Sequence, residues 1–198
     1  ISPATVSAET TTPADAIWLA APTKNLGIHF WLDENGAPYY NVFLNGKALV
    51  ENSALGFSST IGDFKSGFEI SNVTESSANE TWSPVVGEKS IIIDHYNQKS
   101  IELTHTSGKK ITIEMRAYDT GVAFRYILPQ ETSDYTINKE YTQFVFPQGT
   151  VAYAHAYNNQ TIPMRIPVEE FANYSQHYQR PMTLLYPDGA AMTIAEAN

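Results

Sequence analysis

The sequence predicts an all-β fold of antiparallel strands, and three observations lead to this prediction. Apolar and polar residues alternate with a period of two, most clearly over 26–32, 111–117 and 122–128. Glycine-containing turn dipeptides separate the alternating stretches at short intervals. Apolar residues at helical spacing are hard to find anywhere in the chain. Many short strands with little helix are typical of a β-sandwich or a barrel.

The alternating stretches group into two predicted meanders of three strands each, over 26–50 and 101–128. In the first, Asn35-Gly36 and Asn45-Gly46 are dipeptides that favour type I′ hairpin turns. In the second, Ser107-Gly108 and Thr120-Gly121 occupy the predicted turns. Shorter strands are predicted at Ile91–Ile93, Phe144–Phe146, Leu184–Tyr186 and Met192–Ile194.

The best helical candidate is a single turn over Pro167–Tyr174. Pro167 is suited to open a helix, and Glu169 and Glu170 would face its positive end. No repeat of fixed period is visible in the sequence, which excludes propellers and solenoids.

Length and composition indicate one globular domain. We expect a flexible amino-terminal segment over 1–17 and a single β-sandwich domain over 18–198. The segment 1–17 lacks the basic start and the apolar stretch of a signal peptide. No apolar run reaches the ~20 residues of a membrane-spanning helix. The absence of cysteine excludes disulfides, thiolate nucleophiles and zinc held by cysteine.

The charge balance excludes nucleic acid as a partner. The formal net charge is −9, from 21 acidic residues against 12 Lys and Arg. Lys109-Lys110 is the largest basic group in the sequence, so a phosphate backbone or an anionic membrane surface would be repelled.

Residues that often carry chemistry give no local motif. The five histidines lack the spacing of a local metal site, and we interpret them as structural or surface residues. A Ser-His-Asp triad assembles from distant positions, but the sequence has no Gly-x-Ser-x-Gly motif to support one. The histidines are His29, His95, His105, His155 and His177.

Carboxylates and aromatic rings leave two interpretations open. A glycosidase needs two carboxylates about 5 to 9 Å apart, and spacing alone selects no pair among 21. Glu196 follows an apolar strand, where it is either a site residue or an exposed acid near the end of the sequence. Exposed aromatic rings stack on sugars, although packing in the core or at strand edges is the commoner role. The candidate rings are Trp31, Trp82, Tyr153 and Tyr157.

An ordered series of motifs carries a resemblance to a known family. The central motif is Arg116-Ala117-Tyr118-Asp119-Thr120-Gly121-Val122-Ala123-Phe124-Arg125-Tyr126. Residues 36–42, 53–56, 80–88 and 94–97 precede it, and 142–146, 181–184 and Glu196-Ala197 follow. From Trp18 to Asn198 this series resembles the amino-terminal domain of glycoside hydrolase family 97.

The resemblance implies a galactose-mutarotase-like β-super-sandwich that precedes a catalytic (β/α)₈ barrel. It also implies a bacterial α-glucosidase or α-galactosidase, periplasmic or secreted, that hydrolyses oligosaccharides. The catalytic acids would lie on the barrel and none in this chain, while Glu196 would be one ligand of a calcium ion beside the substrate. One glutamate supplies at most two of the six to eight oxygens that calcium takes. We therefore expect the chain alone to be inactive and to bind calcium weakly or not at all.

Two alternatives remain at this point. A free-standing carbohydrate-binding module would hold sugar on Trp31 or Trp82 without chemistry, and a purely structural sandwich would do neither. The sequence does not identify substrate-binding residues, and it does not distinguish glucoside from galactoside or inversion from retention.

Overall fold

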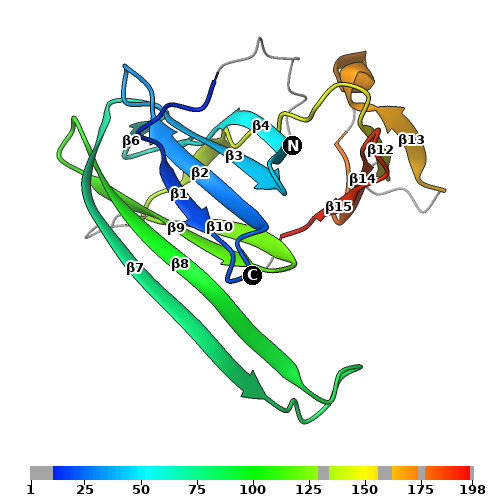
Figure 1. Cartoon of the computed structure of the whole chain (residues 1–198). Coiled ribbons are helices and arrows are strands. Elements are labelled where there is room, and N and C mark those ends of the chain that lie inside the picture. Colours follow the sequence, from blue (N-terminus) through cyan, green and yellow to red (C-terminus); the bar gives the residue numbers. More distant parts are fainter. Residues whose placement is uncertain (1–10, 129–133, 156–161, 174–176, 197–198) are drawn as a thin grey trace.

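The computed structural model describes residues 11–128, 134–155, 162–173 and 177–196 (Figure 1). Within these ranges the chain forms four antiparallel β-sheets and one short 3₁₀ helix. The all-β prediction is therefore confirmed.

The first sheet contains the first predicted meander. Its strands run in the order β1 (Ile17–Ala20), β2 (Leu26–Leu32), β3 (Pro38–Leu44) and β4 (Lys47–Ala54). Asn45 and Gly46 both have positive φ, 51° and 78°, as a type I′ turn between β3 and β4 requires. The meander prediction is confirmed, with β1 added at its edge.

The loop between β2 and β3 differs from the predicted type I′ turn. Residues 33–37 connect the two strands, and within this loop Gly36 has positive φ but Asn35 does not. The Asp33 carboxylate accepts hydrogen bonds from the backbone N–H groups of Asn35 (2.9 Å) and Ala37 (2.8 Å). This aspartate side chain therefore shapes a longer loop than the Asn-Gly dipeptide alone suggests.

The second sheet contains the second predicted meander. Its order is β10 (Gly121–Ile127), β9 (Lys110–Tyr118), β8 (Ile92–His105) and β7 (Phe68–Trp82). The short strand predicted at 91–93 is the beginning of the 14-residue β8. The 15-residue β7 was not predicted, because polar residues dominate both of its faces.

Two smaller sheets complete the fold. One has the order β11 (Ile137–Glu140), β5 (Phe57–Ser59) and β6 (Gly62–Phe64). The other, which we call the carboxy-terminal sheet, has the order β13 (Met164–Pro167), β12 (Val151–Ala154), β14 (Met182–Leu185) and β15 (Ala191–Ile194). Strands β14 and β15 confirm the two last predicted strands. The predicted helical turn is the 3₁₀ helix η1 (Val168–Asn173), which directly follows Pro167.

The strand predicted at Phe144–Phe146 is wrong. This segment makes a single bridge, between Val145 and Glu51. The Val145 N–H donates instead to the Ser53 hydroxyl at 2.9 Å, and Phe146 is buried in the core. The apolar alternation here reflects side chains that pack into the core from an irregular segment.

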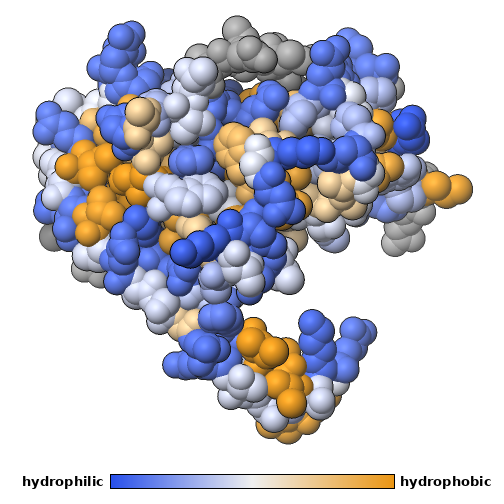
Figure 2. Space-filling view, viewed as in Figure 1, coloured by the Kyte–Doolittle hydropathy of each residue, from blue (hydrophilic) through white to orange (hydrophobic). Residues whose placement is uncertain are grey.

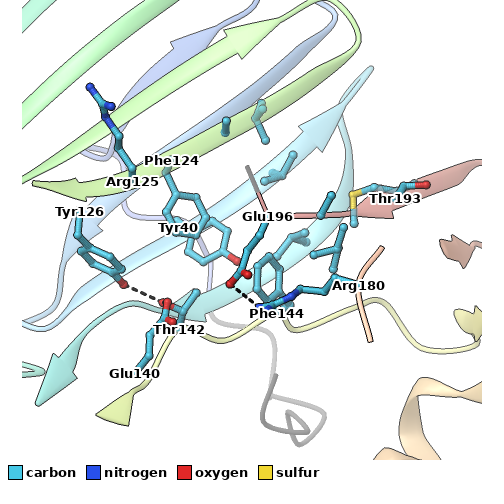
Figure 3. Close-up of a pocket in the computed structure, with 17 residues that line it drawn as sticks. Tyr40, Phe124, Arg125, Tyr126, Glu140, Thr142, Phe144, Arg180, Thr193 and Glu196 are labelled. Carbon is cyan, nitrogen blue, oxygen red and sulfur yellow. Dashed lines mark hydrogen bonds and ion pairs between the residues drawn. The ribbon is translucent and has the colours of Figure 1, made fainter. Parts of the chain in front are cut away.

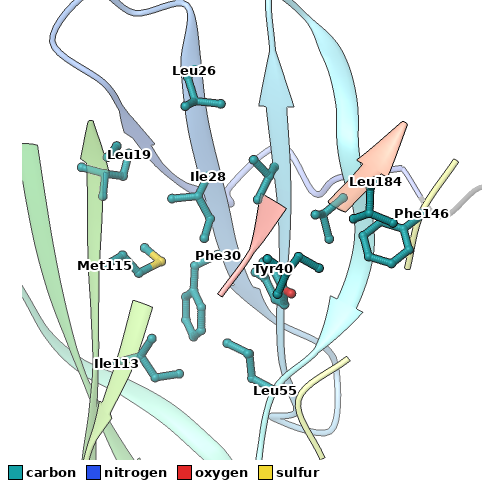
Figure 4. Packing of buried hydrophobic residues seen from close by; sticks show 14 of the residues in the cluster. Leu19, Leu26, Ile28, Phe30, Tyr40, Leu55, Ile113, Met115, Phe146 and Leu184 are labelled. Carbon is teal, nitrogen blue, oxygen red and sulfur yellow. The ribbon is translucent and has the colours of Figure 1, made fainter. Parts of the chain in front are cut away.

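One buried apolar cluster runs through all four sheets (Figure 4). Ile28 and Phe30 of β2 face Ile113 and Met115 of β9 across the interior, and all four are almost fully buried. Leu184 of β14 belongs to the same cluster, which joins the carboxy-terminal sheet to the sandwich. This continuous core fixes the positions of the strand ends that form the pocket described below.

The β7–β8 hairpin extends beyond the sandwich (Figure 1). Toward the end of the hairpin, the last residue pair between β8 and β9 is Tyr96 with Tyr118. At this level the Asp119 carboxylate accepts the Thr23 N–H at 2.9 Å, and Asn97 donates to the carbonyl of Ala20 at 2.9 Å. Beyond these two hydrogen bonds, β7 and β8 continue as a two-stranded ribbon.

The residues that precede β1 contact the outer face of the first sheet. The Asn41 side-chain amide donates to the Thr12 hydroxyl at 2.6 Å. The flexibility of the segment 1–17 stays a prediction, since residues 1–10 lie outside the described ranges. Across the described part of the chain, no helix has the length and hydropathy needed to span a bilayer.

Candidate functional site

A pocket of about 540 Å³ lies where strands β3, β4 and β10 meet β15 (Figure 3). Its volume falls in the range of small-molecule binding sites. The pocket joins three parts of the sequence that lie far apart. Its lining residues are Tyr40, Val42, Val50, Val122–Tyr126, Glu140, Thr142, Phe144, Arg180 and Met192–Glu196.

Aromatic rings form the floor of the pocket. The Tyr40 ring lies 5.1 Å from that of Phe124 and 6.2 Å from that of Phe144, measured between centroids. The Tyr40 hydroxyl donates to the carbonyl of Gln143 at 2.7 Å. Burial raises the pKa of Tyr40 well above its usual value, with the neighbouring Tyr126 a second cause. Tyr40 is therefore a neutral donor and not a nucleophile at neutral pH.

One wall carries a directed chain of hydrogen bonds. The Gly56 N–H donates to the Tyr126 hydroxyl oxygen at 2.9 Å, and the Thr142 hydroxyl donates to Glu140 at 2.7 Å. The Tyr126 and Thr142 oxygens are 2.9 Å apart, so Tyr126 donates to Thr142, whose own proton is already directed to the carboxylate. Burial raises the pKa of Tyr126 to about 12. This wall is a fixed polar network that ends on Glu140.

The other wall carries an ion pair between Arg180 and Glu196. The pairing of β14 with β15 ends at Met182 opposite Ile194, and Arg180 and Glu196 lie just beyond this last pair. The Glu196 side chain is 59% exposed and lies at the pocket rim (Figure 3). The end of this strand pair thus brings the two charges together.

The residues at this rim do not form a calcium cage by themselves. Calcium takes 6 to 8 oxygen ligands. Among the described residues no group of three or more Asp, Glu, His or Cys side chains is placed to hold a metal ion. The Glu196 carboxylate also already has Arg180 as a cationic partner. An exposed carboxylate of this kind fits calcium only as one ligand of several, with the others supplied from outside these residues.

Comparison with protein-family models matches residues 19–198 to the model described as glycosyl-hydrolase 97 N-terminal. The chain belongs to this family. The match agrees with the extent of the resemblance found in the sequence, which runs from Trp18 to Asn198.

Solved structures of family 97 enzymes share the fold of this domain. The enzyme from Pseudoalteromonas sp. strain K8, in complex with acarbose, superimposes with a TM-score of 0.79 at 25% identity. The same enzyme in complex with panose gives 0.78. Each match covers 88% of this chain but 27% of the enzyme's chain. A β-arabinopyranosidase, at 23% identity and a TM-score of 0.73, shows the fold alone.

One curated relative matches part of the chain in sequence. A protein named probable retaining alpha-galactosidase, from Streptomyces bingchenggensis (strain BCW-1), is 26% identical over 122 residues. The aligned part is 62% of this chain and 19% of that protein. The family 97 domain therefore spans a minor part of the length of the relatives that it matches.

His29 and His105, two of the five histidines of the family 97 domain, take part in packing and local hydrogen bonds. His29 Nδ1 lies 2.9 Å from Asn41 Oδ1, and its ring lies 4.3 Å from that of Trp18. Burial lowers the pKa of His29. His105 lies 2.8 Å from the Ser107 hydroxyl and packs against Phe64. None of the five histidines lines the pocket.

The aromatic candidates do not form one platform. Trp31 is only 8% exposed and stacks on Tyr39 with ring centroids 5.9 Å apart, which agrees with the packing role and not with the alternative of an open sugar-stacking face. Trp82 is exposed at the end of β7, and Tyr153 is exposed on β12, in a different sheet. Tyr157 lies outside the described residues.

Sequence reasoning placed Glu196 but missed the groups around it. Arg180, Tyr126, Thr142 and Glu140 were not singled out as site residues. Part of the signal for Arg180 was available, because β14 and β15 were predicted and Arg180 and Glu196 lie just outside their paired residues. Glu169 and Glu170, at the first turn of η1, lie outside the pocket.

Proposed function

We propose that this chain is the non-catalytic amino-terminal domain of a longer α-glycosidase that hydrolyses oligosaccharides. The family match over 19–198 is the observation that carries the proposal. An α-glucosidase or α-galactosidase is supported by relatives described in complex with panose or acarbose, or named an alpha-galactosidase. Either activity is proposed for the whole protein and not for these 198 residues.

The pocket chemistry supports a non-catalytic role. Glycoside hydrolysis needs a carboxylic acid as proton donor and a second carboxylate as base or nucleophile. The two carboxylates that line the pocket are engaged, Glu140 by Thr142 and Glu196 by Arg180. Burial keeps the Tyr40 and Tyr126 hydroxyls protonated. We propose that the catalytic carboxylates lie on a downstream (β/α)₈ barrel.

Within this role, Glu196 is proposed to supply one carboxylate to a calcium ion beside the substrate. The ion pair with Arg180 holds the Glu196 carboxylate at the pocket rim, and the exposure of this carboxylate leaves it accessible to a neighbouring domain. Arg180 balances the charge of Glu196 while no other cation is near. A calcium ion in such a site would supply Lewis-acid stabilisation of charge on oxygen.

Isothermal titration of calcium into the natural polypeptide that contains this chain tests the proposal. We expect Glu196→Gln to weaken calcium binding by at least ~10-fold, since one charged ligand is replaced by a neutral amide. Glu34→Gln, in the exposed loop between β2 and β3, is the matched control and should bind like the wild type. Equal affinities for wild type and Glu196→Gln would refute the role of Glu196.

We also propose that the parent enzyme is exported to the periplasm or the medium, as the family resemblance implies. Fractionation of the source cells, followed by detection with an antibody to this domain, tests this. Recovery in the cytosolic fraction alone would refute it.

A further inference from the structure

The end of the β7–β8 hairpin carries large apolar side chains on its surface. Figure 2 shows apolar residues gathered at the end of the projecting hairpin, away from the body of the domain. We call this cluster the hairpin tip. Its exposed fractions are 54% for Trp82, 101% for Val85, 89% for Val86, 54% for Ile91 and 68% for Ile93. Clusters of exposed apolar side chains on soluble proteins mark interaction sites.

The apolar side chains lie on both faces of the ribbon. Cross-strand partners share a face, and successive residues of a strand alternate between faces. Trp82 is opposite Ile92 on one face, while Ile93 is opposite Thr81 on the other, which is the face of the buried Ile101. Folding the ribbon against its own sandwich would therefore cover one set and leave the other exposed. A surface that buries the hairpin tip has to surround it.

The ribbon at the tip has little support of its own. In its outermost part, residues 79–82 pair with residues 92–95, and none of the described strands pairs with this part as a third strand. A two-stranded ribbon is marginally stable in water. Glu80 also lies directly opposite Asp94, and like charges across a strand pair are destabilising. A partner with apolar contacts and a basic group beside these carboxylates would stabilise the ribbon.

We propose that the hairpin tip inserts into an apolar groove on the downstream part of the same polypeptide, with a basic side chain facing Glu80 and Asp94. This rests on the proposed function, in which the chain is one domain of a longer enzyme. The match covers 27% of the solved family 97 enzymes, so nearly three quarters of such an enzyme lies outside it. A partner covalently linked to this domain needs no second association step, because the link sets a high local concentration.

Other occupants fit the tip less well. A second copy of this chain would bring Glu80 and Asp94 toward their own equivalents, between two molecules of formal net charge −9. A sugar site needs polar side chains placed around the aromatic ring. The other exposed apolar residues of the hairpin tip, Val85, Val86, Ile91 and Ile93, are aliphatic and offer a sugar neither a hydrogen bond nor a ring face.

Site-specific photo-cross-linking in the natural polypeptide tests the proposal. The photoreactive residue p-benzoylphenylalanine replaces Val86, which is 89% exposed in this domain. The same replacement at Ile137 of β11, an exposed apolar residue of another sheet, is the matched control. After irradiation, the adducts are mapped by mass spectrometry of proteolytic peptides.

The proposal predicts an adduct at monomer mass between the peptide that contains position 86 and a peptide beyond residue 198. The position 137 control should not give this adduct. Adducts at dimer mass would show that the tip binds a second copy of the chain. The absence of any peptide adduct would show that the tip is exposed to solvent and contacts no protein. The same downstream adduct from position 137 would mean that the link is not specific to the tip. Each of these three results overturns the proposal.

A second measurement separates the docking from the activity. Trp82→Ser with Ile93→Ser should reduce the yield of the position 86 adduct severalfold, while Ile127→Ser should not. The unlabelled wild-type polypeptide is assayed in parallel on aryl α-glucosides and α-galactosides. An adduct in an inactive protein would refute the proposed function and keep the docking, whereas activity without an adduct would do the reverse.

Discussion

The two halves of the β7–β8 hairpin use the same strand pairing in different surroundings. In the inner half, Ile101 and Leu103 are fully buried and β9 continues the sheet. In the outer half, Trp82 and Ile93 are exposed, and none of the described strands pairs with β7 or β8 as a third strand. Backbone pairing alone therefore carries the ribbon well past the core. The difference indicates that the inner half stabilises this domain, while the outer half is available for contact with something else.

Hydrogen bonds between the large sheets mark the boundary between the halves, where β9 ends while β7 and β8 remain paired. Where β9 ends, Asn97 bonds to Ala20 of β1, and Asp119 bonds to Thr23 in the loop between β1 and β2. These contacts hold the two large sheets together beside the last residue pair of β8 with β9. Substitutions in the core, in the polar networks and at the tip can therefore be compared directly.

The largest effect is expected in the core of the inner half. Ile113→Ala removes a fully buried side chain of β9 and should lower the free energy of unfolding by about 2–5 kcal/mol. Urea unfolding of the 198-residue chain measures it. Ile127→Ala, on the adjacent β10 and exposed, should change stability by less than ~0.5 kcal/mol. Similar losses for both variants would contradict this account of the core.

A smaller effect is expected at the pocket wall. Tyr126→Phe removes the acceptor of the Gly56 N–H and the donor to the Thr142 oxygen and should cost about 1–3 kcal/mol in the same assay. Tyr39→Phe is the control, because the Tyr39 hydroxyl makes no hydrogen bond within the described ranges. A Tyr126→Phe variant as stable as the wild type would show that the directed hydrogen-bond chain does not contribute.

The hydrogen bonds of Asp119 should make the free energy of unfolding weakly dependent on pH. The hydrogen bonds from the Thr23 side chain and backbone lower the pKa of Asp119. A carboxyl group with a lowered folded-state pKa adds stability above its unfolded pKa of about 4, and this stability is lost as pH falls through the folded value. Asp119→Asn should therefore reduce the loss of stability between pH 5 and pH 3. The effect is small because the carboxylate is open to water.

Urea unfolding at several pH values checks this expectation. Glu34→Gln is again the control, with a carboxylate in an exposed loop. An identical pH dependence for wild type and Asp119→Asn would show that the hydrogen bonds between Thr23 and Asp119 do not contribute to stability.

The smallest effect is expected at the hairpin tip. Trp82→Ser should change the stability of the 198-residue chain by no more than ~0.5 kcal/mol, because the ring is exposed on a ribbon outside the core. A loss comparable with that of Ile113→Ala would show that the outer half belongs to the folding core after all.

The sequence predicted the longer strands whose two faces differ, but it missed β7, whose faces are alike, and short strands such as β12 and β13. In β2 and β9 the alternation gave the correct strands because one face is buried and the other is not. β7 is polar on both faces over most of its length, so no period marked it. Phe144–Phe146 shows the opposite error, since an irregular segment can place alternate rings in the core without strand pairing.

The site was predictable only in part. The family resemblance singled out Glu196, which lies just beyond the end of β15. The chain from Gly56 through Tyr126 and Thr142 to Glu140 joins positions more than 80 residues apart at its ends. No spacing rule gives such a network, because it depends on how the sheets pack. The sequence left both packing and sugar stacking open for Trp31 for the same reason, since the burial of its ring beside Tyr39 depends on the neighbouring strand.

Hydrolysis of aryl α-glucosides and α-galactosides, measured for the 198-residue chain and for the natural polypeptide at equal concentration, tests the central claim most directly. We predict turnover of one of these substrates by the natural polypeptide and a rate no higher than buffer for the 198 residues alone. Turnover by the 198-residue chain, abolished by Glu140→Gln or Glu196→Gln, would contradict the account and place the catalytic carboxylates in this domain.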